Sequence, residues 1–268
     1  MSKSAPLAVV TGAASGIGGG LAREASRRGY RVLMADRDEA GLAKAAAEIP
    51  NGETLVVDVT DPAQVERLAE RADALGGTDL LFNNAGIMAT GLLWEIPAQD
   101  WDRAFAVNVS GVLNGARSFI PRMIARGTPA RVVNTASVGG FLPSPLMAPY
   151  SATKFAVVAL TESMMYELQL LQAPVAVSLL APGPVHSAIF ADPFAGAVHP
   201  ATEGFVGQMR ALLSRNGMDA DPFAALVFDG IARGDYWLVP QPESLDPSLE
   251  NRNAMIRERR SPDVTVFG

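Results

Sequence analysis

The first half of the chain alternates short β-branched runs with helical patterns, and this alternation constrains the fold more than any other feature of the sequence. Strand-like runs and helical patterns follow one another in the order 7–10, 18–28, 31–35, 39–49, 54–57, 61–75 and 79–82. Strands joined through helices lie parallel in one sheet, with helices on both faces. The sequence therefore predicts an α/β fold with a doubly wound parallel sheet of the Rossmann-like kind.

The second half of the chain continues this alternation less regularly. Its helical and strand-like patterns lie at 101–126, 131–136, 148–171, 175–180, 219–233 and 236–239. Residues 182–216 are rich in Pro, Gly, Ala and Phe and have weak periodicity, so we expect an irregular segment in which 184–216 forms a substrate-binding loop or lid. Residues 240–268 are expected to form a C-terminal tail with helical character. Because no repeat or linker divides the chain, residues 1–268 are predicted to form one domain.

The composition argues against several classes of protein. The chain has 268 residues, of which 49% are hydrophobic, so a sizeable core is available. It has no cysteine, which excludes disulfides, thiolate metal sites and cysteine nucleophiles. The net charge of −6 argues against a nucleic-acid partner, and no apolar run approaches the roughly 18 residues of a membrane-spanning helix. The segment 1–6 has no signal-peptide pattern, so the expected location is the cytoplasm.

A glycine-rich turn follows the first strand. The stretch TGAASGIG, residues 11–18, contains Gly12, Gly16 and Gly18. Glycines at a strand-to-helix turn let the backbone approach a pyrophosphate and direct the helix N-terminus at its negative charge. The spacing Gly-x-x-x-Gly-x-Gly differs from the commoner Gly-x-Gly-x-x-Gly, and taken alone it also fits a simple tight turn.

An aspartate at the end of the second strand supports the dinucleotide interpretation. Asp36 lies about twenty residues after the glycines, where an acid can bind the 2′-hydroxyl of a ribose. Its carboxylate would repel the 2′-phosphate of NADP, which favours NAD. The neighbouring Arg37 keeps NADP possible, because a guanidinium can hold that phosphate or stack on adenine. Ser15, inside the glycine turn, supplies no basic side chain for it.

Three polar residues of the second half suggest the chemistry. Tyr150 and Lys154 are four residues apart and therefore share one face of a helix. That spacing alone also describes an ordinary exposed helix face. The helix is otherwise rich in Ala, Val, Leu and Met, so the lysine needs a partner or a solvated cleft. Ser137 lies upstream, just past the end of a strand.

Together these motifs resemble the short-chain dehydrogenase/reductase family in its single-domain form. The resemblance covers about residues 6–190, and the residues that carry it are Thr11, Gly12, Gly16, Gly18, Asp58, Asn83, Asn84, Ala85, Gly86, Asn108, Ser137, Tyr150, Lys154 and the run 182–187. Each motif is short, but their joint order and spacing are specific. The resemblance implies a Rossmann-like oxidoreductase.

The resemblance also implies roles for individual residues. The expected cofactor-binding residues are Gly12, Ser15, Gly16, Ile17, Gly18, Asp36, Arg37, Asp58, Val59, Asn84, Ala85, Gly86, Tyr150, Lys154, Pro182, Gly183, Val185 and Ser187. Within this set Asp58 and Val59 would border the adenine, and Val185 and Ser187 would meet the nicotinamide carboxamide. Asn108 would lie at a break in the long helix and hold a water in a proton relay to Lys154. The alternatives are a helix cap for Asp58 and a buried, backbone-satisfying amide for Asn108.

The expected catalytic residues are Asn108, Ser137, Tyr150 and Lys154. A free tyrosine with a pKa of about 10 is a poor base at neutral pH. The Lys154 ammonium and a positive nicotinamide ring would lower that pKa. Ser137 would donate a hydrogen bond to the substrate oxygen. We expect no metal, because His186 and His199 have no ligand-like companions in the sequence.

The expected substrate is a small neutral molecule, a hydrophobic or aromatic secondary alcohol or ketone. The residues that would wall its pocket are Ile87, Met88, Leu92, Trp94, Phe141, Leu142, Leu146, Met147, Ile189, Phe190, Phe194 and Phe205. No Lys or Arg occurs in 138–149 or 184–209, which disfavours phosphate-bearing carrier thioesters. About half of these apolar residues could instead be ordinary core.

Other functions stay open at this point. The family resemblance implies a homotetramer or dimer formed by long apolar helices. The alternatives are an NADP(H)-dependent ketoreductase and a dinucleotide-binding regulatory protein without turnover. The second alternative is disfavoured because all four expected catalytic residues are present. Sugar-nucleotide dehydratase or epimerase chemistry would need a larger C-terminal substrate domain.

Overall fold

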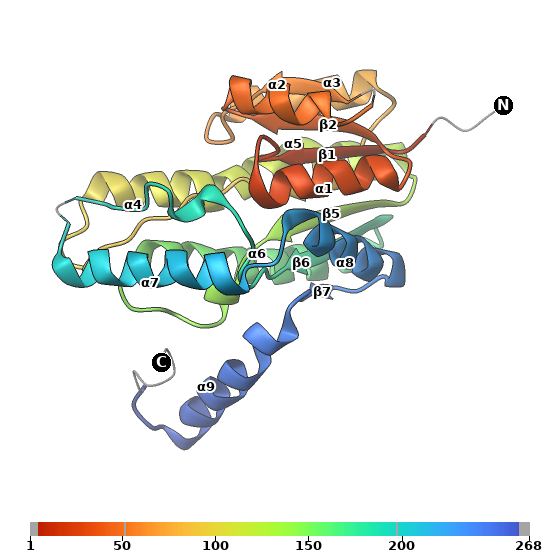
Figure 1. The fold of residues 1–268 in the computed structure, drawn as a ribbon. Coiled ribbons are helices and arrows are strands. Elements are labelled where there is room, and N and C mark those ends of the chain that lie inside the picture. Colours follow the sequence, from red (N-terminus) through yellow and green to blue (C-terminus); the bar gives the residue numbers. More distant parts are fainter. Residues whose placement is uncertain (1–4, 51, 197, 263–268) are drawn as a thin grey trace.

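The computed structural model describes residues 5–50, 52–196 and 198–262, and its sheet has seven parallel strands in the order β3-β2-β1-β4-β5-β6-β7 (Figure 1). The strands are β1 (Leu7–Thr11), β2 (Arg31–Asp36), β3 (Glu53–Val56), β4 (Leu80–Asn83), β5 (Ala130–Thr135), β6 (Val175–Leu180) and β7 (Trp237–Leu238). This arrangement confirms the predicted doubly wound parallel sheet.

Helices connect the strands and cover both faces of the sheet. They are α1 (Gly16–Arg27), α2 (Glu39–Ala47), α3 (Pro62–Ala74), α4 (Ala98–Phe105), α5 (Gly111–Arg126), α6 (Ala148–Leu170), α7 (Pro200–Asn216), α8 (Ala220–Arg233) and α9 (Asp246–Glu258). Their ends follow local chemistry: the Asp61 carboxylate caps the N-terminus of α3 ahead of Pro62, and Gly127 ends α5 in the left-handed conformation.

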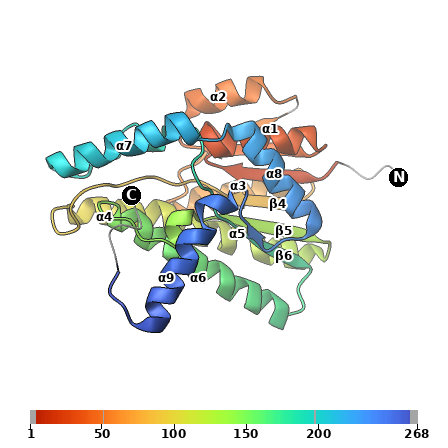
Figure 2. The same cartoon turned by 60° about the horizontal axis from the view of Figure 1, so that its bottom comes forward.

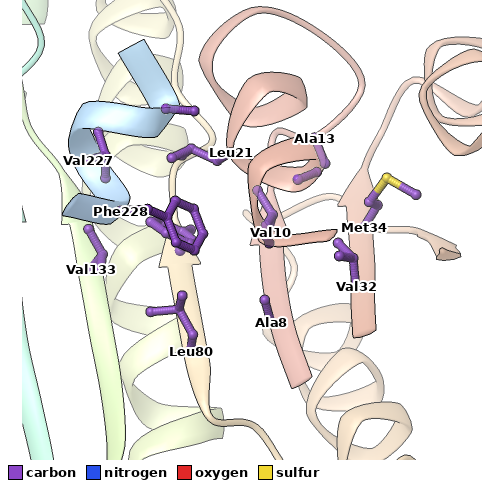
Figure 3. Close-up of a cluster of buried hydrophobic side chains, with 14 of the residues drawn as sticks. Ala8, Val10, Ala13, Leu21, Val32, Met34, Leu80, Val133, Val227 and Phe228 are labelled. Atoms are coloured by element: carbon purple, nitrogen blue, oxygen red, sulfur yellow. The ribbon is translucent and has the colours of Figure 1, made fainter. Parts of the chain in front are cut away.

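The alternation of side chains along β1 divides the core into two layers. Ala8 and Val10 pack with α1, α2 and α8 on one face, where Phe228 lies over the strands beside Phe82 (Figure 3). Leu7 and Val9 face the opposite layer, which is made by α3, α5 and α6. Successive strand residues point to opposite faces, so a strand buried on both sides is a continuous apolar run. The two layers hold the sheet rigid and leave its ends for binding.

Two sequence-based predictions differ from the structure. The helix predicted at 101–126 begins earlier, at Ala98, and is interrupted by a π-helical turn, Ala106–Ser110. The segment predicted to be irregular contains α7, a helix of 17 residues. Its periodicity was weak because only Thr202 and Val206 of this helix are buried, so most of its surface faces solvent.

The C-terminal part lies to one side of the sheet. After β7 the chain makes a 3₁₀ turn, Pro242–Ser244, and α9 then runs outward and crosses near α6 (Figures 1 and 2). The Arg252 guanidinium lies 5.3 Å from the centre of the Phe155 ring of α6. The predicted tail 240–268 therefore has the expected helical character as far as it is described. The predicted domain and tail include residues 1–4, 51, 197 and 263–268, which lie outside the described residues. Within the described ranges, no helix combines the length and apolarity needed to cross a membrane.

The close approach of α1 and α8 gives a matched test of the packing. A Cβ on Gly20 would lie 2.5 Å from the backbone oxygen of Ala220, whereas a Cβ on Gly19 would meet nothing closer than 3.5 Å. We expect Gly20→Ala to separate the two helices and lower the free energy of unfolding by about 1–3 kcal/mol. Gly19→Ala should be neutral or stabilising by up to about 1 kcal/mol, because alanine favours helix. Denaturant unfolding of the cofactor-free variants measures both effects, and equal stability of the two would contradict this account.

Candidate active site

The candidate site lies at the carboxyl edge of the sheet, where β1 has β2 on one side and β4 on the other. Ligands of open parallel sheets bind in the crevice created by such a reversal of strand order. The segments that follow β1, β4, β5 and β6 all open at this edge, and they are 12–16, 84–86, 136–140 and 181–187. The fold therefore brings together motifs that are spread over residues 12–187 of the sequence.

The glycine turn is shaped for close approach of a ligand to the backbone. Gly12 and Gly16 have φ angles of 68° and 52°, a conformation that glycine adopts without strain. A Cβ on Gly18 would collide with the carbonyl oxygen of Gly12, so α1 can pack here only without that side chain. The hydroxyl of Ser15, the N-cap residue of α1, does not cap the helix. The first N–H groups and the dipole of α1 are therefore available to a pyrophosphate.

The Asp36 carboxylate is fixed next to this turn. One oxygen accepts a hydrogen bond from the backbone N–H of Ala14 at 3.1 Å, and the other accepts one from the N–H of Asp38 at 3.1 Å. Asp36 is half-buried, while Arg37 is exposed to solvent. The carboxylate is thus held next to the glycine turn, and its predicted contact with a ribose stays a prediction.

The turn after β4 is tied directly to β1. The Thr11 hydroxyl oxygen accepts hydrogen bonds from the backbone N–H groups of Asn84 and Ala85, and the Asn84 side chain donates to the Thr11 carbonyl at 3.0 Å. Beneath it, the Asn83 side chain donates to that of Asn134. These bonds hold Asn84–Gly86 beside the glycine turn. The predicted role of Asn84, Ala85 and Gly86 in cofactor binding stays a prediction.

The structure gives Asp58 a partner within the protein. Its carboxylate accepts hydrogen bonds from the backbone N–H and the hydroxyl of Thr60, at 2.9 and 2.7 Å. Val59 is buried, and its carbonyl accepts a bond from the Asn114 side chain. These bonds form a local turn ahead of α3, and because the N-cap of α3 is Asp61, Asp58 does not cap that helix. The predicted adenine contact of Asp58 and Val59 stays a prediction.

The loop after β6 faces the glycine turn from the opposite side. A Cβ on Gly16 would lie 3.1 Å from the Cβ of Ser187, so the two segments approach each other closely. Val185 is buried and pairs with Met218 in an isolated parallel bridge. The Pro182 carbonyl accepts a hydrogen bond from the N–H of Val138, which links this loop to the segment that carries Ser137.

Tyr150 and Ser137 meet around Gly139. A Cβ on Gly139 would lie 3.3 Å from the Tyr150 ring and 3.5 Å from the Ser137 hydroxyl oxygen. That oxygen accepts a hydrogen bond from the Gly139 N–H at 3.0 Å. Tyr150 and Ser137 are 7% and 8% exposed, so both are almost fully covered. The Ser137 hydroxyl also lies within hydrogen-bonding reach of the Tyr150 phenol.

Lys154 is buried below the tyrosine. Its ammonium lies 5.7 Å from the centre of the Tyr150 ring and donates a hydrogen bond to the carbonyl oxygen of Thr135 at 2.9 Å. A Cβ on Gly86 would be 3.4 Å from Nζ, so the backbone of the turn after β4 lies directly beside the ammonium. Burial lowers the pKa of Lys154 from its ordinary value of 10.5 to about 8.

Asn108 lies in the π-helical turn between α4 and α5 and is completely buried. Its side-chain oxygen accepts from the Ile87 N–H at 2.8 Å, and its amide donates to the Ile87 carbonyl and to the Thr153 hydroxyl. The Thr153 hydroxyl in turn donates to the Tyr150 carbonyl at 2.8 Å. Asn108 thus occupies a break in the long helix, as the family resemblance implies. Its side chain satisfies backbone groups, so the predicted relay to Lys154 stays a prediction.

The surroundings of Tyr150 add an effect that the sequence analysis did not include. In the cofactor-free chain, burial raises the pKa of Tyr150, and the Ser137 hydroxyl opposes this only in part. Removing the phenol from water disfavours the charged tyrosinate more than the neighbouring groups favour it. The predicted lowering of this pKa by Lys154 together with a positive nicotinamide ring concerns the cofactor-bound site and stays a prediction.

An apolar cluster covers the tyrosine from the side of α7. It consists of Met88, Met147, Tyr150, Ile189, Phe190, Phe194, Phe205, Val206, Met209 and Leu213. Six of the twelve predicted pocket residues belong to it. Of the six outside this cluster, Ile87 packs in the core, Phe141 contacts Trp237, and Trp94 is 76% exposed. The segment 184–216 therefore does face Tyr150, although half of it is helical.

Several contributing residues were missed by the sequence analysis. The backbone carbonyl of Thr135 binds the Lys154 ammonium, and the Thr153 hydroxyl links Asn108 to the Tyr150 carbonyl. A threonine at either position does not indicate such a role in the sequence. Arg210 of α7 donates hydrogen bonds to the carbonyls of Phe190 and Ala191 at 2.9 Å and lies 6.0 Å from the centre of the Phe194 ring. It fixes the turn over the tyrosine, and it lies just outside the stretch 184–209 that was searched for cations.

The two histidines have local partners. His186 Nδ1 is 2.7 Å from the Asp219 carboxylate, and His199 Nδ1 accepts from the N–H of Ala201 at the start of α7. Within the described residues, no group of three or more metal-ligating side chains lies together.

Comparison with known proteins identifies the class of protein that this fold and site define. The family model described as short chain dehydrogenase matches residues 6–196, and the chain belongs to the short-chain dehydrogenase/reductase family. It is 33% identical to the "CLA biosynthesis dehydrogenase/reductase" of Lactiplantibacillus plantarum, over 96% of this chain and 95% of that protein. It is 35% identical to the 1-deoxy-11-beta-hydroxypentalenate dehydrogenase of Streptomyces exfoliatus, over 86% and 81%.

Among solved structures, the chain is similar to a short-chain dehydrogenase/reductase from Burkholderia phymatum in complex with NAD. The TM-score is 0.91 at 34% identity, and the match covers 98% of each chain. The predicted family and fold are therefore confirmed.

The buried lysine makes a prediction about stability and pH. Below pH 8 the folded chain must bury a charged ammonium, and the pKa difference between 10.5 and about 8 corresponds to a cost of about 3 kcal/mol. The cost disappears between pH 8 and 10.5, where the folded group is neutral and the unfolded one is still charged. We therefore expect the cofactor-free variant Lys154→Met to be more stable than the wild type at pH 7. The gain is reduced by the loss of the hydrogen bond to the Thr135 carbonyl.

This gap in stability should narrow as the pH rises from 8 to 10.5. Other ionisable groups are shared by both proteins and cancel in the comparison. Urea unfolding at each pH measures the gap, and a gap independent of pH would contradict the burial of a charged Lys154.

Proposed function

We propose that this protein is an NAD(H)-dependent oxidoreductase that interconverts a neutral hydrophobic or aromatic secondary alcohol and its ketone. The observation that carries the proposal is the position of Tyr150 between the Ser137 hydroxyl and the buried Lys154 ammonium, under an apolar cluster and beside the glycine turn. A proton acceptor, a hydrogen-bond donor and a cation at one crevice are the groups that alcohol oxidation requires.

The crevice fits a dinucleotide. The uncapped N-terminus of α1 would hold the pyrophosphate, the Asp36 carboxylate would accept from the ribose hydroxyls, and Val185 and Ser187 would bind the nicotinamide carboxamide. Gly12, Gly16 and Gly18 leave the space a side chain would fill. When bound, the nicotinamide supplies the hydride acceptor or donor. The NAD of the similar Burkholderia phymatum protein supports this choice, and the exposed Arg37 leaves NADP(H) as a second cofactor.

In the oxidation direction, Tyr150 accepts the proton of the substrate hydroxyl while the C–H bond gives up a hydride. Ser137 donates a hydrogen bond to the substrate oxygen and stabilises the charge that develops on it. Lys154, whose pKa of about 8 keeps much of it charged at neutral pH, stabilises the tyrosinate and would bind the nicotinamide ribose. Asn108 would position a water that carries the proton onward. Reduction reverses these steps, and Tyr150 then donates.

Because burial raises the pKa of Tyr150, the tyrosine needs the positive charge of Lys154 to act as a base. Burial alone would keep the phenol protonated and useless as a base. The positive charges of Lys154 and of an oxidised nicotinamide oppose this effect inside a low-dielectric site, where charges interact more strongly than in water. Substrate binding that excludes further water strengthens the same interaction.

The substrate class follows from the cover over the tyrosine. The cluster on the side of α7 consists of aliphatic, aromatic and methionine side chains, which bind apolar surface and support an apolar substrate. The name of the similar Streptomyces exfoliatus dehydrogenase gives a hydroxylated substrate, 1-deoxy-11-beta-hydroxypentalenate, which supports an alcohol as the substrate. α7 and the turn Ala188–Phe190 would open to admit substrate, because the catalytic groups are almost fully covered.

We also propose that the enzyme is a cytoplasmic homo-oligomer, a tetramer or dimer. Large apolar side chains are exposed on two helices, Phe105 on the short helix α4 and Tyr166 and Leu170 on the long helix α6. Contiguous exposed apolar surface is typical of subunit interfaces.

Removing one oxygen atom tests the role of the tyrosine. Tyr150→Phe should lower kcat by about 10²–10⁴-fold, the usual contribution of a positioned acid or base, while the Kd for NADH changes little. Tyr166→Phe is the matched control, since Tyr166 lies on the same helix and is 61% exposed. Turnover of an aryl or cyclic alcohol with NAD, and NADH fluorescence titration, measure the two quantities. Undiminished turnover by Tyr150→Phe would remove it from the mechanism.

The cofactor assignment depends on Asp36. Asp36→Ala should weaken NADH binding by about 10- to 100-fold, which is the loss of a hydrogen bond to a charged group worth about 1.5–3 kcal/mol. NADPH binding should improve, because the repulsion of the 2′-phosphate is removed. Glu39→Ala, which removes an exposed carboxylate close by, serves as the control. An unchanged ratio of the two Kd values would show that Asp36 does not face the ribose.

A further inference from the structure

The loop after β6 is held by two segments that are distant in sequence. The carbonyl oxygen of Pro184 accepts a hydrogen bond from the backbone N–H of Met218 at 3.0 Å and a second one from the Gln241 side-chain amide at 2.8 Å. Both lone-pair directions of this carbonyl are therefore occupied. The neighbouring residue Val185 is one of those proposed to meet the nicotinamide.

Gln241 comes from the segment that follows β7, to which no role has been assigned so far. The β7 residue Leu238 accepts a hydrogen bond from the N–H of Ala181, and the chain then turns under the loop. A Cβ on Gly183 would lie 3.0 Å from Ser244 and 3.1 Å from the side-chain oxygen of Gln241. The backbone of the loop thus rests directly on residues 241–244.

The side chain of Gln241 is 4% exposed, and its two ends differ. The amide nitrogen bonds to Pro184, whereas the amide oxygen is buried and receives no hydrogen bond from the described part of the chain. A buried acceptor without a partner destabilises a fold, and a methionine of similar shape would fill this space without that cost. The bond to Pro184 is therefore the feature that a glutamine at this position adds.

We infer that Gln241 is a positioning residue for the cofactor, and that it acts by fixing the Pro184 carbonyl and with it the loop 182–187. The segment 240–245 then supports the loop on the nicotinamide side of the site, and α9 follows directly after this segment. This inference rests on the proposed dinucleotide site. Gln241 touches neither substrate nor reacting atoms, so it acts on cofactor affinity and not on the proton transfer.

The test separates positioning from stability. Gln241→Met removes the donor and the unpartnered oxygen at nearly constant shape. We expect the Tm of the cofactor-free protein to stay the same or rise, while the Kd for NADH increases about three- to tenfold, as for one lost neutral hydrogen bond. The KM for NADH should rise by a similar factor. The kcat at saturating NADH should stay within about twofold of the wild-type value. Gln169→Met, at an exposed position of α6, is the control.

A second variant guards against an uninformative result. Gln241→Glu keeps the size and replaces the donor by an oxygen facing the Pro184 carbonyl, so it should weaken NADH binding more than Gln241→Met. NADH titration of the wild type comes first: if the wild type binds no dinucleotide, the proposed function fails. If the wild type binds and both Gln241 variants bind equally well, the inference about Gln241 is wrong. A lowered Tm with an unchanged Kd would likewise overturn it and make Gln241 merely structural.

Discussion

The parallel register of β1, β4, β5 and β6 is the constraint on which the rest of this structure depends. Because these strands run in the same direction, their carboxyl ends form one edge, and four loops from distant parts of the sequence meet there. The register is held by apolar layers on both faces, so its position does not depend on the site. Residues that do chemistry can then occupy loops and helix ends without weakening the core.

Buried polar groups connect the core to the site. Asn83 and Asn134 bond across β4 and β5, and Asn134 also donates to Thr161 of α6, which fixes the helix that carries the tyrosine and the lysine. Asn108 and Thr153 continue this set of bonds to the backbone of Tyr150. Each buried group in this series has a partner, which is the condition under which polar groups specify one arrangement. Outside this series, the oxygen of Gln241 is one of four buried side-chain atoms without a partner in the described part of the chain, and it lies beside the proposed cofactor loop.

The burial of the charged Lys154 ammonium destabilises the fold, and no oppositely charged side chain compensates for it in the described part of the chain. The ammonium is surrounded by protein and bonds to a neutral carbonyl, and burial lowers its pKa to about 8. Tyr150 next to it is shifted in the opposite direction, toward the neutral phenol. Burial therefore works against the charged form of both groups, and a cofactor with a positive ring would shift the balance for the tyrosine. Perturbed pairs of this kind are characteristic of catalytic sites.

The sequence by itself determined the class of fold, the family, and the order of the motifs along the chain. It did so because strand and helix periodicities and glycine at a strand-to-helix turn are local properties, and because the site motifs have fixed spacings. The tertiary structure decided what depends on contacts between distant segments. It showed the carbonyl of Thr135 as the partner of Lys154, a helix in the segment 200–216, six of twelve pocket residues gathered over Tyr150, and Gln241 beneath Pro184. A backbone carbonyl has no sequence signature, so the partner of Lys154 could not be predicted from the sequence. The burial of Tyr150 depends on residues that are distant in the sequence, so only the structure could show in which direction its pKa shifts in the cofactor-free protein.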